Sequence, residues 1–130
     1  MRAILSGGSL VGVLHTAGVG DKGLLAELGG RRVRWMQASK AWGAWCTHTA
    51  VAARPLEACV LWSSVGSGLG NVGQANYAAA NASLDACALS WRDGGVAACS
   101  VQWPLVGGAG MDAAAFAAVG ERQVALVGMA

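Results

Sequence analysis

Charged side chains are scarce in this chain of 130 residues. They make up 12% of the sequence, against about a quarter in an ordinary soluble domain, and the net charge is only +2. So small a charge gives no reason to expect a nucleic-acid partner or an anionic membrane surface. Hydrophobic residues reach 55%, so a chain of this length can bury a real core and should bury most of its apolar surface.

The sequence also lacks the patterns of a metal site, a disulfide framework and a membrane span. No two of its cysteines form a C-x-x-C pair, and the two histidines are not spaced with them as zinc ligands. We therefore expect no metal, reduced and buried cysteines, and a cytoplasmic location. The uncharged stretch 58–84 is rich in Ser, Asn, Gln and Gly, which argues against a membrane helix. The cysteines are Cys46, Cys59, Cys87 and Cys99.

Short apolar runs alternate with helical patterns along the chain. The runs are continuous rather than alternating, which is typical of buried strands in a parallel sheet. Strands are expected at residues 11–15, 58–63 and 96–103. Helices are expected at 24–28, 32–53 and 74–92, with a further, weakly patterned helix at 112–119.

Two of the expected helices carry an apolar stripe at helical spacing, which should face the core. The helix at 32–53 is expected to bury Trp35, Ala38, Trp42 and Trp45. The helix at 74–92 is expected to bury Ala80, Leu84, Ala88 and Trp91.

The order of these elements predicts an α/β fold. Strands that alternate with helices form a parallel sheet, so we expect a Rossmann-like three-layer sandwich with helices on both faces of the sheet. A glycine-rich loop at 65–73 follows the second strand. Gly66, Gly68 and Gly70 do not have the G-x-G-x-x-G spacing of a dinucleotide-binding loop, so we interpret the loop as lying on the substrate side.

Four polar residues together have the chemistry that reduction of a ketone requires. Tyr77, the only tyrosine, can donate a proton once a cation lowers its high pKa, and Lys40 is the candidate cation. Ser64 ends an expected strand and can donate a second hydrogen bond to the substrate oxygen. Asn81 follows Tyr77 by one helical turn, so it could fix Lys40 or a relay water.

Each of these residues taken alone has a simpler structural interpretation. A tyrosine near a helix start is usually a packed aromatic residue, a serine at a strand end is usually a cap, and a lysine on a helix is usually solvated. Their combination, at these spacings and within the surrounding sequence, favours the catalytic assignment.

Residues 60–86, which contain Ser64, Tyr77 and Asn81, closely resemble the ketoreductase domain of modular polyketide synthases. That domain belongs to the short-chain dehydrogenase/reductase superfamily. The resemblance covers residues 10–111 and includes Lys40 on a helix that precedes the serine. A lysine on the earlier helix and an asparagine after the tyrosine reverse the order of most short-chain dehydrogenases. That reversal makes the resemblance specific to ketoreductases of polyketide and fatty-acid synthases.

The resemblance implies a cofactor, a substrate and partners. The cofactor would be NADPH, lined by His15, Thr16, Ala17 and Gly18. The substrate would be a β-ketoacyl thioester on an acyl carrier protein, reduced to the β-hydroxyacyl thioester within a polyketide synthase. Residues 1–130 would be the C-terminal portion of the domain, without its N-terminal glycine-rich part, so we expect the chain alone to be inactive.

Two other hypotheses stay open at this point. The chain could be a non-catalytic half-domain that pairs with another ketoreductase half, or a different Rossmann-like enzyme such as a methyltransferase. A basic cluster of Arg31, Arg32 and Arg34 could contact acidic groups of a carrier protein, although a solvated helix start is the simpler interpretation.

Overall fold

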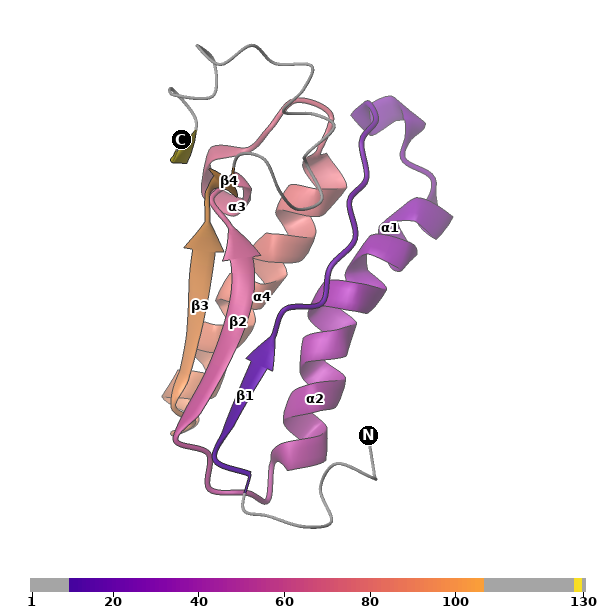
Figure 1. Cartoon of the computed structure of the whole chain (residues 1–130). Helices are drawn as coiled ribbons and strands as arrows, with labels where there is room; N and C mark the ends of the chain where they lie inside the picture. The colour runs from indigo at the N-terminus through magenta and orange to yellow at the C-terminus, as the bar shows by residue number, and fades with distance from the viewer. Residues whose placement is uncertain (1–9, 107–127, 130) are drawn as a thin grey trace.

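The computed structural model describes residues 10–106 and 128–129. Its centre is a parallel sheet of three strands in the order β1-β2-β3: β1 is Gly12–His15, β2 is Ala58–Ser64 and β3 is Ala98–Trp103 (Figure 1). Gly12 pairs with Ala58 and Cys59 with Ala98. A second parallel pair joins β4, Leu105–Val106, to β5, Gly128–Met129.

The helical segments are shorter and more divided than the sequence predicts. The expected helix at 32–53 consists of α1 (Gly30–Gln37), a π-helical turn η3 (Ala38–Trp42) and α2 (Gly43–Val51). The 3-10 turn η2 is Leu25–Glu27 and the long helix α4 is Ala75–Asp93. The glycine-rich loop holds a one-turn helix α3, Gly66–Leu69. The helix predicted at 112–119 lies outside the described residues.

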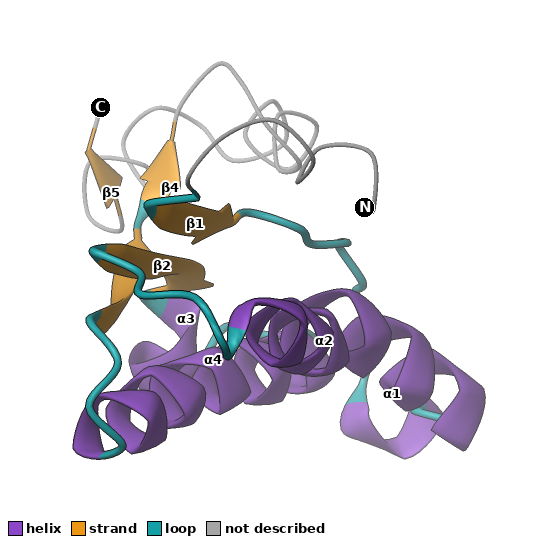
Figure 2. Ribbon diagram, turned by 90° about the horizontal axis from the view of Figure 1, so that it is seen from below, coloured by secondary structure: helices purple, strands orange, loops and turns teal. Residues whose placement is uncertain are grey.

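The α/β class and the parallel sheet are confirmed, and in the described residues the helices cover one face of that sheet (Figure 2). Consecutive strands lie side by side in sequence order. Right-handed crossovers that all step in the same direction place their helices on the same face. Helices on the second face, which the sequence analysis also predicts, are not found among residues 10–106 and 128–129.

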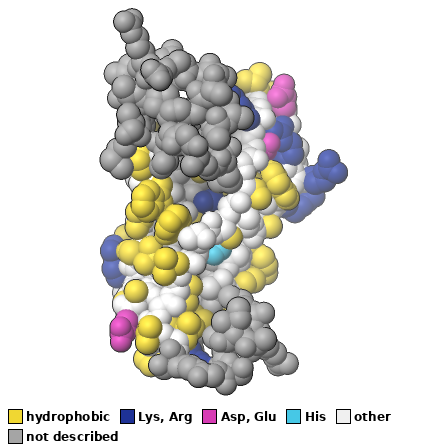
Figure 3. All heavy atoms as spheres, viewed as in Figure 1, with side chains coloured by type: hydrophobic (Ala, Val, Ile, Leu, Met, Phe, Trp, Pro, Cys, Tyr) yellow, Lys and Arg dark blue, Asp and Glu magenta, His cyan; other side chains and the backbone are white. Residues whose placement is uncertain are grey.

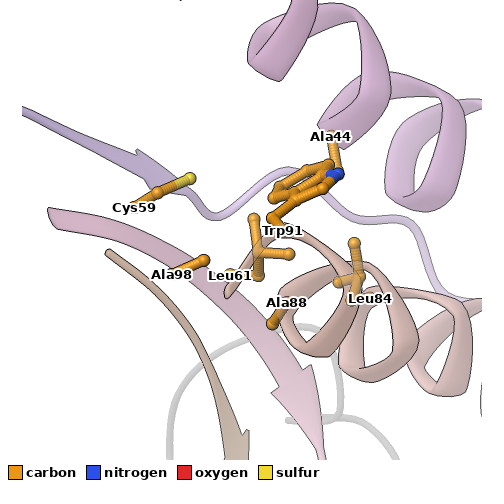
Figure 4. Close-up of a cluster of buried hydrophobic side chains, with 7 residues drawn as sticks. All are labelled: Ala44, Cys59, Leu61, Leu84, Ala88, Trp91 and Ala98. Carbon is orange, nitrogen blue, oxygen red and sulfur yellow. The ribbon is translucent and has the colours of Figure 1, made fainter. Parts of the chain in front are cut away.

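The core lies between the sheet and the helices, where the stripe predicted on α4 is buried as expected. In β2, Cys59, Leu61 and Ser63 face the helices, because neighbouring residues of a strand point to opposite faces. Figure 4 shows Cys59 and Leu61 on the side of the sheet that faces the helices, where Trp91 and Ala44 also lie. The core cluster comprises Ala44, Cys59, Leu61, Leu84, Ala88, Trp91 and Ala98.

The predicted tryptophan stripe on the other helix is wrong. Trp35, Trp42 and Trp45 are between 50% and 64% exposed, and Ala38 is exposed as well. The buried face instead carries Met36, Lys40, Ala44 and Val51. Small residues on this face let the helix approach the sheet closely: a Cβ on Gly43 would lie 3.1 Å from Cε1 of His15. Three indoles would hold the helix away.

The prediction of buried cysteines is confirmed only in part. All four thiols are free, Cys59 is buried and Cys87 is half-buried, but Cys46 and Cys99 are exposed. Cys99 points to the sheet face opposite the helices, together with Leu14, Trp62, Val101 and Trp103. Figure 3 views that face and shows hydrophobic side chains gathered over the strands. This explains why an apolar strand residue can still be exposed here.

Candidate active site

The candidate residues gather at one edge of the sheet. β1 ends at His15 and β2 ends at Ser64, and parallel strands end on the same edge, which is where active sites of such sheets form. Lys40 reaches this edge from η3, and its Nζ donates a hydrogen bond of 3.1 Å to the carbonyl of Trp62 in β2.

The structure brings Lys40 and Tyr77 together. Nζ of Lys40 lies 5.8 Å from the centroid of the Tyr77 ring, although the two residues are on different helical segments. The lysine is only 4% exposed, and burial lowers its pKa because the charged ammonium loses water contacts. A buried ammonium beside a tyrosine ring is what the sequence-based hypothesis requires.

Ser64 and Tyr77 are half-buried and available for hydrogen bonding. The Oγ of Ser64 accepts a hydrogen bond of 3.1 Å from the N–H of Gly66, which leaves its own hydroxyl hydrogen free to donate. Tyr77 stands in the first turn of α4, where its N–H donates to Oδ1 of Asn76 at 2.9 Å. The positive end of the helix dipole therefore lies beside Tyr77.

Asn81 is fully buried and contacts the backbone of Tyr77 rather than the ammonium of Lys40. Its side-chain Nδ2 donates to the backbone carbonyl of Tyr77 at 2.9 Å, and the backbone carbonyl of Asn81 accepts from Oγ of Ser63 at 3.2 Å. Its Oδ1 is buried and has no hydrogen-bond partner within the described residues. A buried acceptor without a hydrogen bond lowers the stability of a protein unless a water or another group donates to it.

The four residues proposed to line the cofactor differ in accessibility. Thr16 and Ala17 are exposed and Gly18 is half-buried, whereas His15 is 7% exposed. The Nε2 atom of His15 lies 3.2 Å from the Lys40 carbonyl. Burial lowers the pKa of His15, and the hydrogen bond to that carbonyl only partly opposes the shift.

Sequence reasoning missed a cluster that ties three segments together next to Tyr77. The Asp21 carboxylate accepts hydrogen bonds from Arg32 at 2.6 and 3.1 Å and from Nδ2 of Asn76 at 2.6 Å. The hydrogen bonds from Arg32, then that from Asn76, lower the pKa of Asp21. Arg32 is therefore held in an ion pair, while Arg31 and Arg34 are exposed. A lone acid 11 positions before an arginine gives too weak a signal to predict this pair.

A second missed cluster supports the glycine-rich loop. The Asp85 carboxylate accepts from the hydroxyls of Ser67 and Ser100, each at 2.6 Å, and from Nε2 of Gln102 at 2.9 Å. Burial raises the pKa of Asp85, but the hydrogen bonds outweigh it and the pKa is lowered. Asp85 follows Asn81 by one helical turn, so both lie on the sheet-facing side of α4. That spacing is a signal from which the position of Asp85 at the sheet could have been predicted.

The interpretation of the glycine spacing also needs a correction. Gly68, Gly70 and Gly73 do stand at G-x-G-x-x-G spacing, and Gly70 and Gly73 adopt positive φ of 70° and 73°, which favours glycine. The dinucleotide fingerprint also needs an acid about 20 residues on that binds the ribose. Asp93 stands 20 residues after Gly73, but it is the last residue of α4 and not part of a strand, and the next strand, β3, ends at Trp103.

Neither a metal-binding cluster nor a membrane-spanning helix is found among the described residues. No group of three or more His, Cys, Asp or Glu side chains among them could hold a metal ion. None of their helices is long and apolar enough to span a bilayer.

Comparisons with known proteins show which protein family this chain is similar to. The model of the family described as KR domain matches residues 2–108. The spectinabilin polyketide synthase system protein NorB of Streptomyces orinoci is 46% identical over 121 residues, 93% of this chain and 6% of that protein. The solved PlmKR1 ketoreductase, from the first module of phoslactomycin biosynthesis in Streptomyces sp. HK803, is 34% identical with a TM-score of 0.82. That match covers 95% of this chain and 28% of the other.

A more distant structure shares the fold alone. A short-chain dehydrogenase from Streptomyces avermitilis is 20% identical with a TM-score of 0.73, over 80% of this chain and 41% of its own. The chain thus spans less than half of the length of each of these similar proteins. The residues that the family model matches include the three-stranded sheet, α4 and the segment that carries Lys40.

Proposed function

We infer the function from the family: this chain belongs to the KR domains, the ketoreductases of modular polyketide synthases. We propose that it supplies the substrate-side residues for NADPH-dependent reduction of a β-ketoacyl thioester on an acyl carrier protein to the β-hydroxyacyl thioester. The observation that carries this proposal is the buried Lys40 ammonium, 5.8 Å from the Tyr77 ring, at the edge where β2 delivers Ser64.

Two hydroxyl groups would act on the substrate oxygen. Ser64 donates its free hydroxyl hydrogen to the carbonyl oxygen and stabilises the negative charge that develops there. Tyr77 transfers its phenolic proton to the same oxygen, so that the oxygen becomes the product hydroxyl and the tyrosine becomes a phenolate. NADPH, when bound, supplies the hydride to the carbonyl carbon.

Lys40 and Asn81 would prepare Tyr77 for this step. An ammonium group close by favours the phenolate over the phenol, and the start of α4 does the same through its dipole. Lys40 uses one N–H on the Trp62 carbonyl, and an ammonium has two more. The partnerless Oδ1 of Asn81 is a suitable acceptor for a water that returns a proton toward Lys40 and Tyr77.

The described residues fit the reacting half of a nicotinamide cofactor. The exposed Thr16 and Ala17 and the half-buried Gly18 form a small-residue segment at the end of β1, where a flat ring can approach the backbone. The ammonium of Lys40 suits ribose hydroxyls, which accept hydrogen bonds. For the ribose, the described residues offer no complete dinucleotide fingerprint, since β3 ends without an acid that could accept a hydrogen bond from its hydroxyls.

Family membership removes the methyltransferase hypothesis and leaves the non-catalytic half-domain as the alternative. A half-domain needs the core but not a buried ammonium with lowered pKa beside a tyrosine. Burial of a charge costs stability, so the Lys40 arrangement favours the catalytic proposal.

A composite protein tests the proposal. In the composite ketoreductase, this chain replaces the segment of PlmKR1 that it matches. We expect the composite to oxidise NADPH in the presence of a β-ketoacyl thioester, and the 130-residue chain alone to be inactive. A folded composite that binds NADPH but reduces nothing would favour the half-domain. Activity of the chain alone would mean that it holds a complete cofactor site.

A further inference from the structure

The histidine expected to line the cofactor makes its hydrogen bond elsewhere. The ring of His15 is buried, and its Nε2 lies 3.2 Å from the backbone carbonyl of Lys40, 25 residues later in the chain. A carbonyl oxygen can only accept, so Nε2 carries the proton and donates it. The donor of His15 is therefore already engaged by the segment that carries the lysine.

The carbonyl that His15 binds belongs to the centre of an irregular turn. η3, Ala38–Trp42, is π-helical, and the N–H of Gly43 is shared between the carbonyls of Ala38 and Lys40. Such single π turns inside α-helices are rare and often mark functional positions. The turn needs support from outside the helix, because its hydrogen bonds depart from the regular ladder.

Gly43 allows the histidine to reach this turn. A Cβ at position 43 would lie 3.1 Å from Cε1 of His15 and 3.4 Å from the Ala38 carbonyl oxygen. Any larger residue would push the imidazole away from the Lys40 carbonyl. The histidine, the glycine and the π turn thus form one unit.

We propose that His15 is a positioning residue that acts through this hydrogen bond to the Lys40 backbone. By holding the π turn, it directs the ammonium of Lys40 to the Trp62 carbonyl at 3.1 Å and toward the Tyr77 ring. The proposal rests on the proposed function for its consequence in catalysis, but not for the geometry. It replaces a cofactor-contacting role for the imidazole with a role in placing the cation.

The chain offers a direct probe of where Lys40 sits, because it contains two lysines: Lys22, which is exposed, and Lys40, which is buried. Competitive acetylation followed by mass spectrometry gives the rate at Lys40 relative to Lys22 in the same molecule. We expect His15→Leu to raise this ratio about fivefold, the factor that corresponds to the loss of one ordinary hydrogen bond. The measurement is made on the 130-residue chain and on the composite ketoreductase.

Two further substitutions at position 15 separate hydrogen bonding from packing. The amide nitrogen of glutamine lies about as far from the backbone as Nε2 of histidine, so His15→Gln should restore the wild-type ratio. That of asparagine is one bond shorter, so His15→Asn should behave like His15→Leu. Gly43→Ala should also raise the ratio, because the added Cβ pushes the His15 ring away although residue 15 is still a histidine.

His48→Leu serves as the matched control. It removes the other imidazole of the chain, which stacks on Trp91 at 4.3 Å between ring centroids, and thus reports any general loosening of the core. We expect it to leave the Lys40 to Lys22 ratio unchanged. An equal rise in His48→Leu and His15→Leu, or failure of His15→Gln to restore the ratio, would overturn the proposal.

Kinetics on the composite ketoreductase separate the two roles of His15. If His15 is a positioning residue, His15→Leu should lower kcat about fivefold and leave the KM for NADPH unchanged. A raised KM for NADPH with unchanged kcat would overturn the positioning role and restore the cofactor contact. If acetylation responds as expected but Tyr77→Phe has no effect on reduction, the proposed function fails while the His15–Lys40 link stands.

Discussion

Two polar clusters, one around Lys40 of η3 and one around Asp85 of α4, differ in how completely their charges are hydrogen-bonded. The Asp85 carboxylate receives three hydrogen bonds, from Ser67, Ser100 and Gln102. The Lys40 ammonium has one hydrogen bond within the described residues, to the Trp62 carbonyl, and Oδ1 of Asn81, one helical turn after Tyr77, has none there. Hydrogen bonds lower the pKa of Asp85 despite its burial, while burial alone lowers the pKa of Lys40.

The difference separates a stabilising cluster from the cluster that we propose to be reactive. A charged group that is fully hydrogen-bonded contributes to the fold, whereas a buried and under-bonded one costs stability. Proteins accept such costs mainly at functional sites. The shortage of partners around Lys40 and Asn81 therefore supports the proposal that this cluster, rather than the Asp85 cluster, carries the chemistry.

The largest expected effect is the loss of reduction in Tyr77→Phe. The change deletes one hydroxyl, which is the proposed proton donor, and should lower kcat of the composite ketoreductase about 10²-fold or more. The free energy of unfolding and the binding of NADPH should change little, since the ring remains. Steady-state kinetics with a β-ketoacyl thioester measures the effect, and more than about a tenth of the original kcat would contradict the role of Tyr77.

Asp85→Ala should cause the next largest change, in stability rather than in chemistry. Ser67, Ser100 and Gln102 would each lose an acceptor, which predicts a loss of about 2 kcal/mol in the free energy of unfolding. Urea unfolding of the composite ketoreductase measures it. Asp93→Ala, at an exposed position of the same helix, is the control, and equal losses in the two variants would deny Asp85 a special role.

Lys40→Met should have opposite effects on stability and activity. A group whose folded pKa is lowered, as for Lys40, costs stability at neutral pH, and the cost fades as the pH rises past that pKa. Methionine fills similar space without charge, so we expect a gain of about 1 kcal/mol near neutral pH. Reduction should slow and its pH optimum should change, because the buried Lys40 ammonium, whose pKa is lowered, no longer titrates beside the Tyr77 ring.

The other lysine of the chain provides the control for this experiment. Lys22 is exposed, so Lys22→Met should change neither the denaturant midpoint nor the pH profile. If Lys40→Met destabilised the protein and left the pH optimum in place, Lys40 would be a structural residue.

The sequence predicts the Tyr77 side of the site well because its signals are local. Ser64 ends a strand, and Tyr77 and Asn81 lie one turn apart on a helix whose stripe is buried as expected. Each of these placements follows from spacing within a single element. The resemblance to ketoreductases is carried by the same short segment, which is why the family could be predicted correctly.

The lysine side could not be predicted in detail because it depends on contacts between distant segments. The tryptophans at helical spacing indicate a buried face, but the π turn and the close approach of Gly43 to His15 expose them instead. The direction of the His15 ring depends on a carbonyl 25 residues away. The open face of the sheet likewise follows from which elements cover it and not from the strand sequences.

The smallest expected effect is a difference in the pH dependence of stability. Because the pKa of Asp85 is lowered in the folded protein, its contribution to stability is present above the unfolded-state pKa of about 4. That contribution is lost as the pH falls through the lower pKa of the folded state. Asp21 acts in the same direction. His15, whose neutral form is favoured by burial, adds an earlier loss below about 6.5.

Asp85→Asn isolates the carboxylate part of this dependence. The denaturant midpoint of the composite ketoreductase, measured at a series of pH values, should fall less steeply below about pH 4 in this variant than in the parent. The slope just below about pH 6.5, the ordinary pKa of a histidine, reports the lowered pKa of His15 and should be the same in both. Asp93→Asn should leave both regions unchanged. If Asp85→Asn gave the parent's slope below pH 4, the hydrogen bonds from Ser67, Ser100 and Gln102 would not be what holds this charge. The contrast with Lys40 would then have to rest on the lysine alone.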